Sequence, residues 1–140
     1  MQLFLNGKWR DLREKTEVLN PFDGSVIDTV PTASPAEITA AINGLIDGAQ
    51  SMRNMPSHRR VEILRKTADL MRERQEELGR LISTEEGKVL AEGRIEAGRA
   101  IETIDLSADE ARRLHGETIP LDSTPSGVGK LGFTLRVPCG

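Results

Sequence analysis

From position 34 to position 55 of this 140-residue chain, apolar side chains recur every three or four residues, a spacing that predicts an amphipathic helix. Ser34 and Glu37 have the spacing of a capping box, and Pro35 stands at the first helical position, so the helix should begin there. Pro56 should end it. The expected inward stripe consists of Ile38, Ala41, Ile42, Leu45, Ile46 and Ala49.

The same periodicity continues to residue 115 and constrains most of the fold. It predicts one long helix over 57–86, closed by Gly87, and a third helix over 88–115, closed by Gly116. Small residues in the third helix would allow a neighbour to approach closely, although the glycines among them also weaken a helix. Its expected inward face consists of Ile95, Ile101, Ile104, Ala108, Ala111 and Leu114.

Extended segments flank this helical part on both sides. Asn6-Gly7 favours a tight hairpin turn within residues 1–10, and the turn signals of 20–24 precede the β-branched run 25–30. Near the other end, 117–122 and 130–137 are expected to be two extended segments joined by a loop. The order β, β, α, α, α, β, β predicts an α+β fold and lacks the alternating βαβ units of a parallel nucleotide-binding sheet.

Composition limits the possible partners. The net charge of −3 offers no basic surplus for nucleic acid, and His58-Arg59-Arg60 is interpreted as a solvated helix start. We expect no membrane span, because no run of eighteen apolar residues occurs. A single cysteine cannot form an internal disulfide, and no signal peptide is recognised, so a cytoplasmic location is expected.

Few residues of this chain suggest a catalytic, cofactor-binding or metal-binding site. Gly127, Gly129 and Gly132 have the G-x-G-x-x-G spacing, but an expected strand follows them where a phosphate site needs a helix. Cys139 is interpreted as a small strand residue, because a reactive thiolate needs a helix N-terminus or a positioned base. His58 and His115 are too far apart in sequence to form a short metal-ligand pair. We therefore predict no catalytic, cofactor-binding or metal-binding residue in this chain.

Four short runs, in order along the chain, resemble the N-terminal portion of the NAD(P)-dependent aldehyde dehydrogenase superfamily. Leu5-Asn6-Gly7-Lys8-Trp9 resembles its first strand motif, and Asn20-Pro21 with Gly24 and Ile27 is similar to N-P-x-x-G-x-x-I. Glu85-Glu86-Gly87-Lys88 resembles the E-x-G-K junction, and Arg136-Val137-Pro138-Cys139-Gly140 is similar to the R-x-P-x-G run. Each run is weak alone, and their order makes them specific.

The resemblance implies a parent enzyme that oxidises an aldehyde with NAD or NADP through a cysteine thiohemiacetal, hydride transfer and thioester hydrolysis. Its catalytic and nucleotide-binding residues have no matching positions here, so we expect this chain to be an inactive N-terminal fragment that binds no cofactor by itself. The expected parts are an N-terminal β segment at 1–33, an incomplete coenzyme-domain helical part at 34–116, and an oligomerisation arm with the next strand at 117–140. The expected partners are the remainder of the parent and further copies, through the arm.

A second hypothesis remains open, because amphipathic helices and a free strand edge are also typical of interaction modules. In that case the chain would be a stand-alone helical oligomerisation module without catalysis. A thiol enzyme based on Cys139 is a distant third. The residues leave undetermined the aldehyde, the choice between NAD and NADP, the origin of the truncation and the oligomeric state.

Overall fold

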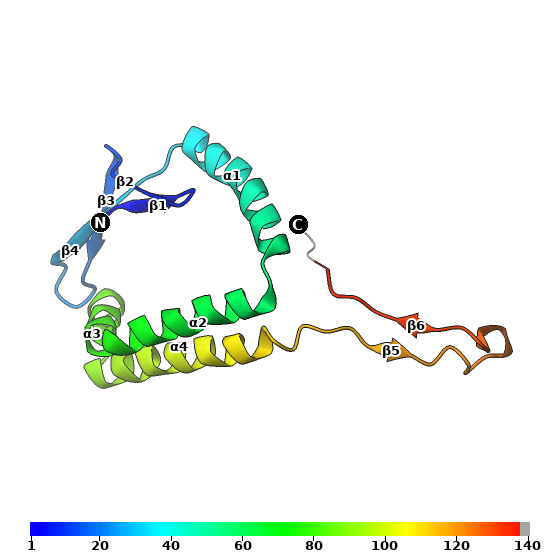
Figure 1. Ribbon diagram of the computed structural model, residues 1–140. Coiled ribbons are helices and arrows are strands. Elements are labelled where there is room, and N and C mark those ends of the chain that lie inside the picture. The colour runs from blue at the N-terminus through cyan, green and yellow to red at the C-terminus, as the bar shows by residue number, and fades with distance from the viewer. Residues whose placement is uncertain (138–140) are drawn as a thin grey trace.

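The computed structural model describes residues 1–137, and Figure 1 shows an open arrangement with a projecting arm. The strands are β1 (Leu3–Leu5), β2 (Lys8–Arg10), β3 (Lys15–Leu19), β4 (Val26–Pro31), β5 (Thr118–Ile119) and β6 (Gly132–Phe133). The helices are α1 (Pro35–Asn54), α2 (Ser57–Glu73), α3 (Gln75–Glu86) and α4 (Leu90–Glu110), and a short 3₁₀ turn covers Pro125–Gly127. This mixed helix and strand composition agrees with the predicted α+β class.

Two small antiparallel pairs form the N-terminal part. β1 pairs with β2 across Asn6 and Gly7, whose positive φ angles of 49° and 76° are those of the predicted tight turn. β3 pairs with β4, and the reversal between them closes with Gly24 at φ 73°. Both reversals lie where the sequence predicted them.

α1 begins with the predicted capping box. The Ser34 hydroxyl accepts from the Glu37 backbone N–H at 3.3 Å, and the Glu37 carboxylate accepts from the Ser34 N–H at 2.8 Å. The ends of α1 and α2 are joined by Arg60, whose Nη2 donates to the Met52 carbonyl at 2.8 Å. The Arg60 contact joins the end of α1 to the first turn of α2, and α1 lies at an angle to the helices that follow (Figure 1).

The packed core lies where α4 runs along both α2 and α3. Its buried apolar residues, among those described, come from α2 and α4 and are small or medium in size: Val61, Ala68, Ala97, Ile101 and Ala108. Small side chains allow the helix axes to approach closely, as the predicted close-packing face of 88–115 implied. Ile95 and Leu114 were wrongly predicted to face inward, since each is 59% exposed.

The prediction of a single helix over 57–86 was wrong. The helix breaks at Arg74, where φ −110° and ψ 14° interrupt the regular backbone, and α3 starts in a new direction. No proline or glycine marks this position in the sequence. The cause is tertiary: the break brings Gly79 against α4, whose Arg94 Cα would lie only 2.9 Å from a Cβ at Gly79.

The predicted stop at Gly116 was also wrong, because α4 ends at Glu110. Gly116 instead lies so close to Thr134 that a Cβ there would overlap the Thr134 carbonyl oxygen. Gly116 therefore allows the two segments of the arm to approach each other closely, and it does not end the helix. Gly87, in contrast, closes α3 in the left-handed conformation with φ 69°, as predicted.

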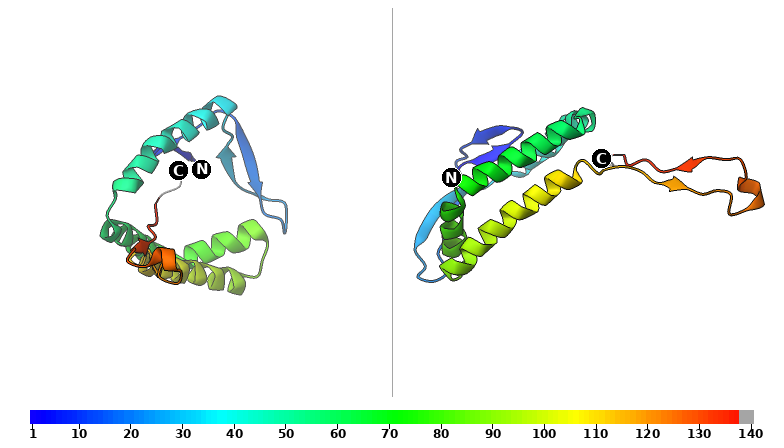
Figure 2. Two further views of the ribbon diagram at one scale, coloured as in Figure 1. Left: turned by 90° about the vertical axis from the view of Figure 1, so that its right-hand side faces the viewer. Right: turned by 60° about the horizontal axis from the view of Figure 1, so that its bottom comes forward.

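The arm is a narrow antiparallel ribbon that leaves the end of α4 and extends away from the helices, as the right-hand view of Figure 2 shows. Thr118 pairs with Phe133, and Ile119 pairs with Gly132. The regular strands are much shorter than the predicted 117–122 and 130–137. Among the described helices, none is long and apolar enough to cross a membrane.

Candidate interaction surface

A hollow lies between the β1–β2 hairpin and α1. It is an open groove of about 790 Å³ with mostly apolar walls. Its lining consists of Phe4, Leu5, Asn6, Gly7, Ile38, Ala41, Ile42, Gly44, Leu45, Asp47 and Gly48. A concave apolar surface of this size is suited to binding other apolar groups.

Asn6 fixes the hairpin against α1 and so gives the groove its shape. Its side-chain Nδ2 donates to the Ala40 carbonyl at 3.1 Å. Gly44 makes room for this contact, because a Cβ at that position would overlap the Asn6 side chain. The tight turn that the sequence predicted thus also positions a side chain on the neighbouring helix.

The apolar stripe of α1 faces solvent along one wall of this groove, which corrects the prediction that it faces inward. α1 contains no buried residue. Ile42 is 59% exposed, Leu45 66% and Ile46 69%. The periodicity did identify the correct face of the helix, but the described residues contain nothing that covers it.

The molecule as a whole exposes far more surface than its mass requires. A compact protein of 15.4 kDa has an accessible surface of about 7,200 Å² by the usual scaling with mass. The structure exposes 10826 Å². The excess of about 3,600 Å² on this one chain is several times the roughly 800 Å² that a standard interface buries on each partner.

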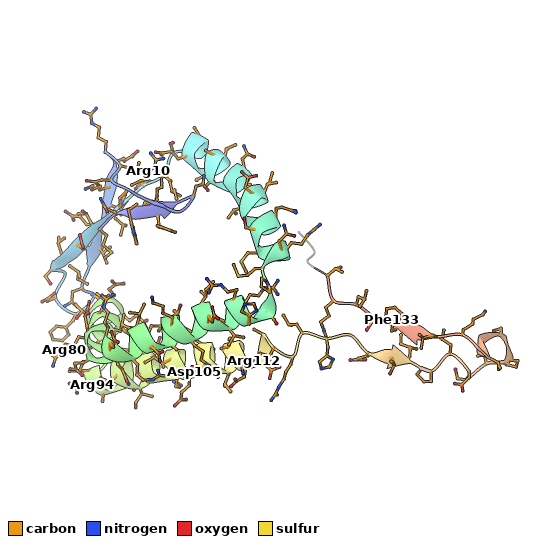
Figure 3. The ribbon with its side chains drawn as sticks, viewed as in Figure 1. Arg10, Arg80, Arg94, Asp105, Arg112 and Phe133 are labelled. Atoms are coloured by element: carbon orange, nitrogen blue, oxygen red, sulfur yellow. The ribbon has the colours of Figure 1, made fainter. Side chains whose placement is uncertain are left out.

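Phe133 and neighbouring apolar side chains make the arm a second exposed surface, well separated from the helices in Figure 3. The exposed apolar residues of the arm are Ile119, Val128, Leu131, Phe133, Leu135 and Val137. An isolated two-stranded ribbon is at best marginally stable in water. The arm therefore has the character of a segment that binds another surface.

A charge network stabilises the helices from which these surfaces extend. Asp105 of α4 accepts from Arg65 and Arg72 of α2, each at 2.5 Å, and Arg65 also reaches Asp109 at 2.6 Å. The hydrogen bond from Arg65 lowers the pKa of Asp105 below its usual 3.8. Figure 3 shows Asp105 on the pair of helices, remote from Phe133. The network is structural, since every member pairs with another.

A similar pair joins α3 to α4. Arg94 donates two hydrogen bonds of 2.7 Å to the carboxylate of Glu76, which lowers the pKa of that carboxyl group. At the junction that follows Gly87, Lys88 contacts Glu86 at 2.6 Å and Glu96 at 2.5 Å, and these contacts raise the Lys88 pKa. The arrangement positions α3 and α4 relative to each other.

The two histidines that were considered as possible site residues lie in different parts of the structure. His58 lies in the first turn of α2, and His115 lies five residues beyond the end of α4, with its Nδ1 3.0 Å from the Gly116 carbonyl oxygen. Cys139 falls outside the described residues. Within residues 1–137, no group of three His, Cys, Asp or Glu side chains has the geometry of a metal site.

The glycine run shares no feature with a phosphate cradle beyond its spacing. Gly127 ends the 3₁₀ turn and is buried, since a Cβ there would overlap the Leu121 carbonyl oxygen. Gly129 has φ 76° in the turn of the arm, and Gly132 opens β6. A strand follows the run, as expected, and the helix N-terminus that binds pyrophosphate in a dinucleotide site is not there.

The chain thus combines an open helical body with a projecting two-stranded ribbon. The model of the aldehyde dehydrogenase family matches residues 9–140, and the chain belongs to that family. The 3-sulfolactaldehyde dehydrogenase of Priestia aryabhattai is 36% identical over 138 residues, which are 99% of this chain and 28% of the relative. The glutarate-semialdehyde dehydrogenase of Pseudomonas putida is 39% identical over 121 residues, 85% of this chain and 25% of the relative.

Parts of solved structures share the arrangement of this chain. Aldehyde dehydrogenase 21 from Physcomitrella patens, in complex with the reaction product succinate, matches 94% of this chain and 28% of its own, with a TM-score of 0.88 and 31% identity. The NADP-dependent glyceraldehyde-3-phosphate dehydrogenase from Bacillus halodurans, complexed with NADP, matches 90% of this chain and 27% of its own, with a TM-score of 0.83 and 34% identity. The chain thus spans little more than a quarter of the length of these relatives and has a partial aldehyde dehydrogenase fold.

Proposed function

We propose that these 140 residues are the N-terminal part of an enzyme that oxidises an aldehyde to a carboxylic acid with NAD or NADP. The observation that carries the proposal is the family match over residues 9–140 of a chain that spans only about 28% of its relatives. The part itself would bind no cofactor and catalyse no reaction. It would contribute structure to an active site formed elsewhere in the protein.

The groove beside α1 is the proposed contact for the rest of the enzyme. Its apolar wall includes Ile42 and Leu45, both more than half exposed. Covering such side chains with apolar groups stabilises an interface by about 25 cal/mol for each Å² removed from water. On this proposal residues 1–33 and 34–116 form the β segment and the helical part of an incomplete coenzyme domain.

The arm, residues 117–137, is the proposed contact between copies of the enzyme. Its tip extends away from α1 and α2 in Figure 1 and in the right-hand view of Figure 2, so the surface that covers it would belong to another subunit. The exposure of Leu131 and Phe133, 79% and 59%, supports this assignment. A homo-oligomer is the proposed assembly.

The cofactor and the cellular setting are proposed from the relatives and from composition. The relative from Bacillus halodurans is complexed with NADP, whereas another, from Corynebacterium glutamicum, is described as NAD-dependent, so either dinucleotide fits the parent enzyme. The single cysteine supports a reducing compartment, and we propose the cytoplasm.

The reading frame after Gly140, followed together with an activity assay, tests this function. We expect the frame to continue into a segment that supplies a nucleophilic cysteine and a nucleotide-binding site. The purified 140-residue chain should produce no reduced nicotinamide from short aldehydes and either dinucleotide. A stop codon directly after Gly140 in the intact gene, or turnover by the pure chain, would show that the proposal is wrong.

The packed core of α2, α3 and α4 favours a second candidate, a stand-alone interaction module. Its buried residues and the Asp105 network require no further chain. If this candidate is correct, the 140 residues should unfold in one cooperative thermal transition and give a single species in light scattering. Partial unfolding or a polydisperse sample would instead support the enzyme fragment.

A further inference from the structure

The chain contains two Asn-Gly pairs, Asn6-Gly7 and Asn43-Gly44. At such a pair the backbone nitrogen of the glycine can attack the side-chain amide carbon of the asparagine, because glycine has no side chain to obstruct the approach. Both asparagines are exposed in the structure. Access to water therefore does not distinguish the two pairs, and the difference between them lies in the backbone.

The backbone N–H of the glycine is held in one pair and free in the other. Asn43 and Gly44 lie inside α1, where the Gly44 N–H donates to the Ala40 carbonyl four residues earlier. Asn6 and Gly7 form the turn between β1 and β2, and the hydrogen bonds among the described residues include none from the Gly7 N–H. The attacking nitrogen is thus available at Asn6 and occupied at Asn43.

The hairpin that carries Asn6 also opens more readily than the middle of α1. Among the described strands, β1 and β2 pair only with each other. A two-stranded hairpin is at best marginally stable in water, whereas Asn43 lies well inside a helix of 20 residues. Local opening of the hairpin lets the side chain of Asn6 turn toward the nitrogen of Gly7.

The side chain of Asn6 is a contact that holds the hairpin on α1. Its Nδ2 donates to the Ala40 carbonyl at 3.1 Å, and it lies against Gly44, where a Cβ would overlap it. The nitrogen that makes this hydrogen bond is the atom that deamidation removes. A carboxylate can only accept hydrogen bonds, so after the reaction a negative charge would face the Ala40 carbonyl oxygen.

We propose that Asn6 is a site of spontaneous deamidation and that the reaction releases the β1–β2 hairpin from α1. The Gly7 nitrogen forms a bond to Cγ of Asn6 and loses its proton, while the bond from Cγ to Nδ2 breaks and the side-chain nitrogen leaves as ammonia. Water then opens the cyclic imide and leaves aspartate or isoaspartate. The net reaction consumes water, releases ammonia and involves no oxidation or reduction.

Release of the hairpin would change the groove beside α1. Phe4 and Leu5 line this groove from the hairpin side, and the Phe4 ring packs on Trp9 with 4.9 Å between the ring centroids. Isoaspartate would have a further effect, because it lengthens the backbone inside the tight turn. The inference depends on the geometry of the hairpin and not on the proposed enzymatic function.

Peptide mapping by mass spectrometry of the wild-type 140-residue chain tests the site and requires no variant. In mildly alkaline buffer, deamidation should accumulate at least about tenfold faster at Asn6 than at Asn43, because the Gly44 amide must first leave the helix. The same chain unfolded in urea is the matched control, and there the two rates should become similar. The proposal is overturned if the folded chain shows equal rates, a faster rate at Asn43, or no product at Asn6 while the unfolded chain reacts.

Asn6→Asp tests the effect of the reaction on the hairpin. Hydrogen exchange of residues 3–10 should accelerate about tenfold or more, because a hydrogen bond is lost and a charge is left beside a carbonyl oxygen. The fluorescence of Trp9, the single tryptophan, should change with it. Asn43→Asp adds the same charge at the other pair and should leave the exchange of residues 3–10 as in the wild type.

Hairpin exchange in Asn6→Asp that equals that of the wild type would show that deamidation does not release the hairpin. Equal acceleration by Asn43→Asp would show that added charge, and not the lost Asn6 contact, is the cause, and it would also overturn the proposal. The reading frame after Gly140 tests the enzyme proposal separately, and none of these results affects it.

Discussion

Gly93 of α4 lies directly against the backbone of Gly79 in α3, and a Cβ at Gly93 would overlap the Gly79 carbonyl oxygen. In the other direction, a Cβ at Gly79 would lie 2.9 Å from the Cα of Arg94. Both glycines are buried. The pair sets the distance between the two helices, and Arg94 then reaches Glu76 across the same contact.

Gly93→Ala should destabilise the chain by about 1–3 kcal/mol, because the added methyl group forces the backbones of two helices apart. Chemical denaturation monitored by circular dichroism measures this change. Gly98→Ala is the matched control on the same helix, where the nearest atom is the end of the flexible Gln75 side chain at 3.2 Å. It should be neutral or stabilise the helix by up to about 1 kcal/mol. Equal losses from the two variants would contradict the close-packing role of Gly93.

The helix break at Arg74 shows what local sequence patterns could not predict. Capping and turn residues encode their own geometry, so the hairpin at Asn6, the capping box at Ser34 and the left-handed Gly87 were all predicted correctly. Nothing in the residues around Arg74 disfavours a helix. The helix breaks where Gly79 can contact α4, and α4 is distant from Arg74 in the sequence. A pattern that compares residues three or four positions apart cannot predict such a contact.

Burial separates two leucine-sized residues that the sequence could not tell apart. Ile101 is 4% exposed in α4, and Leu45 is 66% exposed in α1. Ile101→Ala should destabilise the chain by about 2–5 kcal/mol, because it removes buried methyl groups and leaves a cavity. Leu45→Ala should change the free energy of unfolding by less than about 0.5 kcal/mol, as for other surface positions. Urea denaturation of both variants checks this contrast, and a large loss from Leu45→Ala would show that the α1 stripe is already covered within the chain.

The capping box should control the local stability of α1. Ser34→Ala should cost about 1 kcal/mol, since it removes the oxygen that accepts from the Glu37 N–H. α1 contains no buried residue, so the effect should appear as faster hydrogen exchange in the first turns of α1 and not throughout α2 and α4. Ser51→Ala, which removes only a hydroxyl bond of 3.1 Å to the Asp47 carbonyl within the helix, is the control. Uniform acceleration over all helices in Ser34→Ala would contradict this view.

The candidate surface was only partly predictable. The apolar stripe of α1 was predictable as one face of a helix, because a period of 3.6 residues can be read from the sequence. Whether a face is covered within the chain depends on the path of the backbone, and that information is not local. The signal that would have located the groove is Gly44, a glycine inside a predicted helix opposite the Asn6-Gly7 turn.

Asp105 should make the stability of the α2–α4 pair sensitive to acid. Its pKa is lowered below 3.8 in the folded state, chiefly by the hydrogen bond from Arg65, so the folded chain holds this proton less tightly than the unfolded chain. The resulting stabilisation is fully present above about pH 5 and is lost as the pH falls through 3.8 and then through the folded-state value. Asp105→Asn should therefore lower the midpoint of thermal unfolding at neutral pH and flatten its decline below pH 4. Glu110→Gln, which breaks only the exposed pair with Arg113, is the control and should leave the pH profile of the wild type unchanged. If Asp105→Asn and the wild type lose stability in parallel on acidification, the network does not couple α2 to α4 in the way that its geometry indicates.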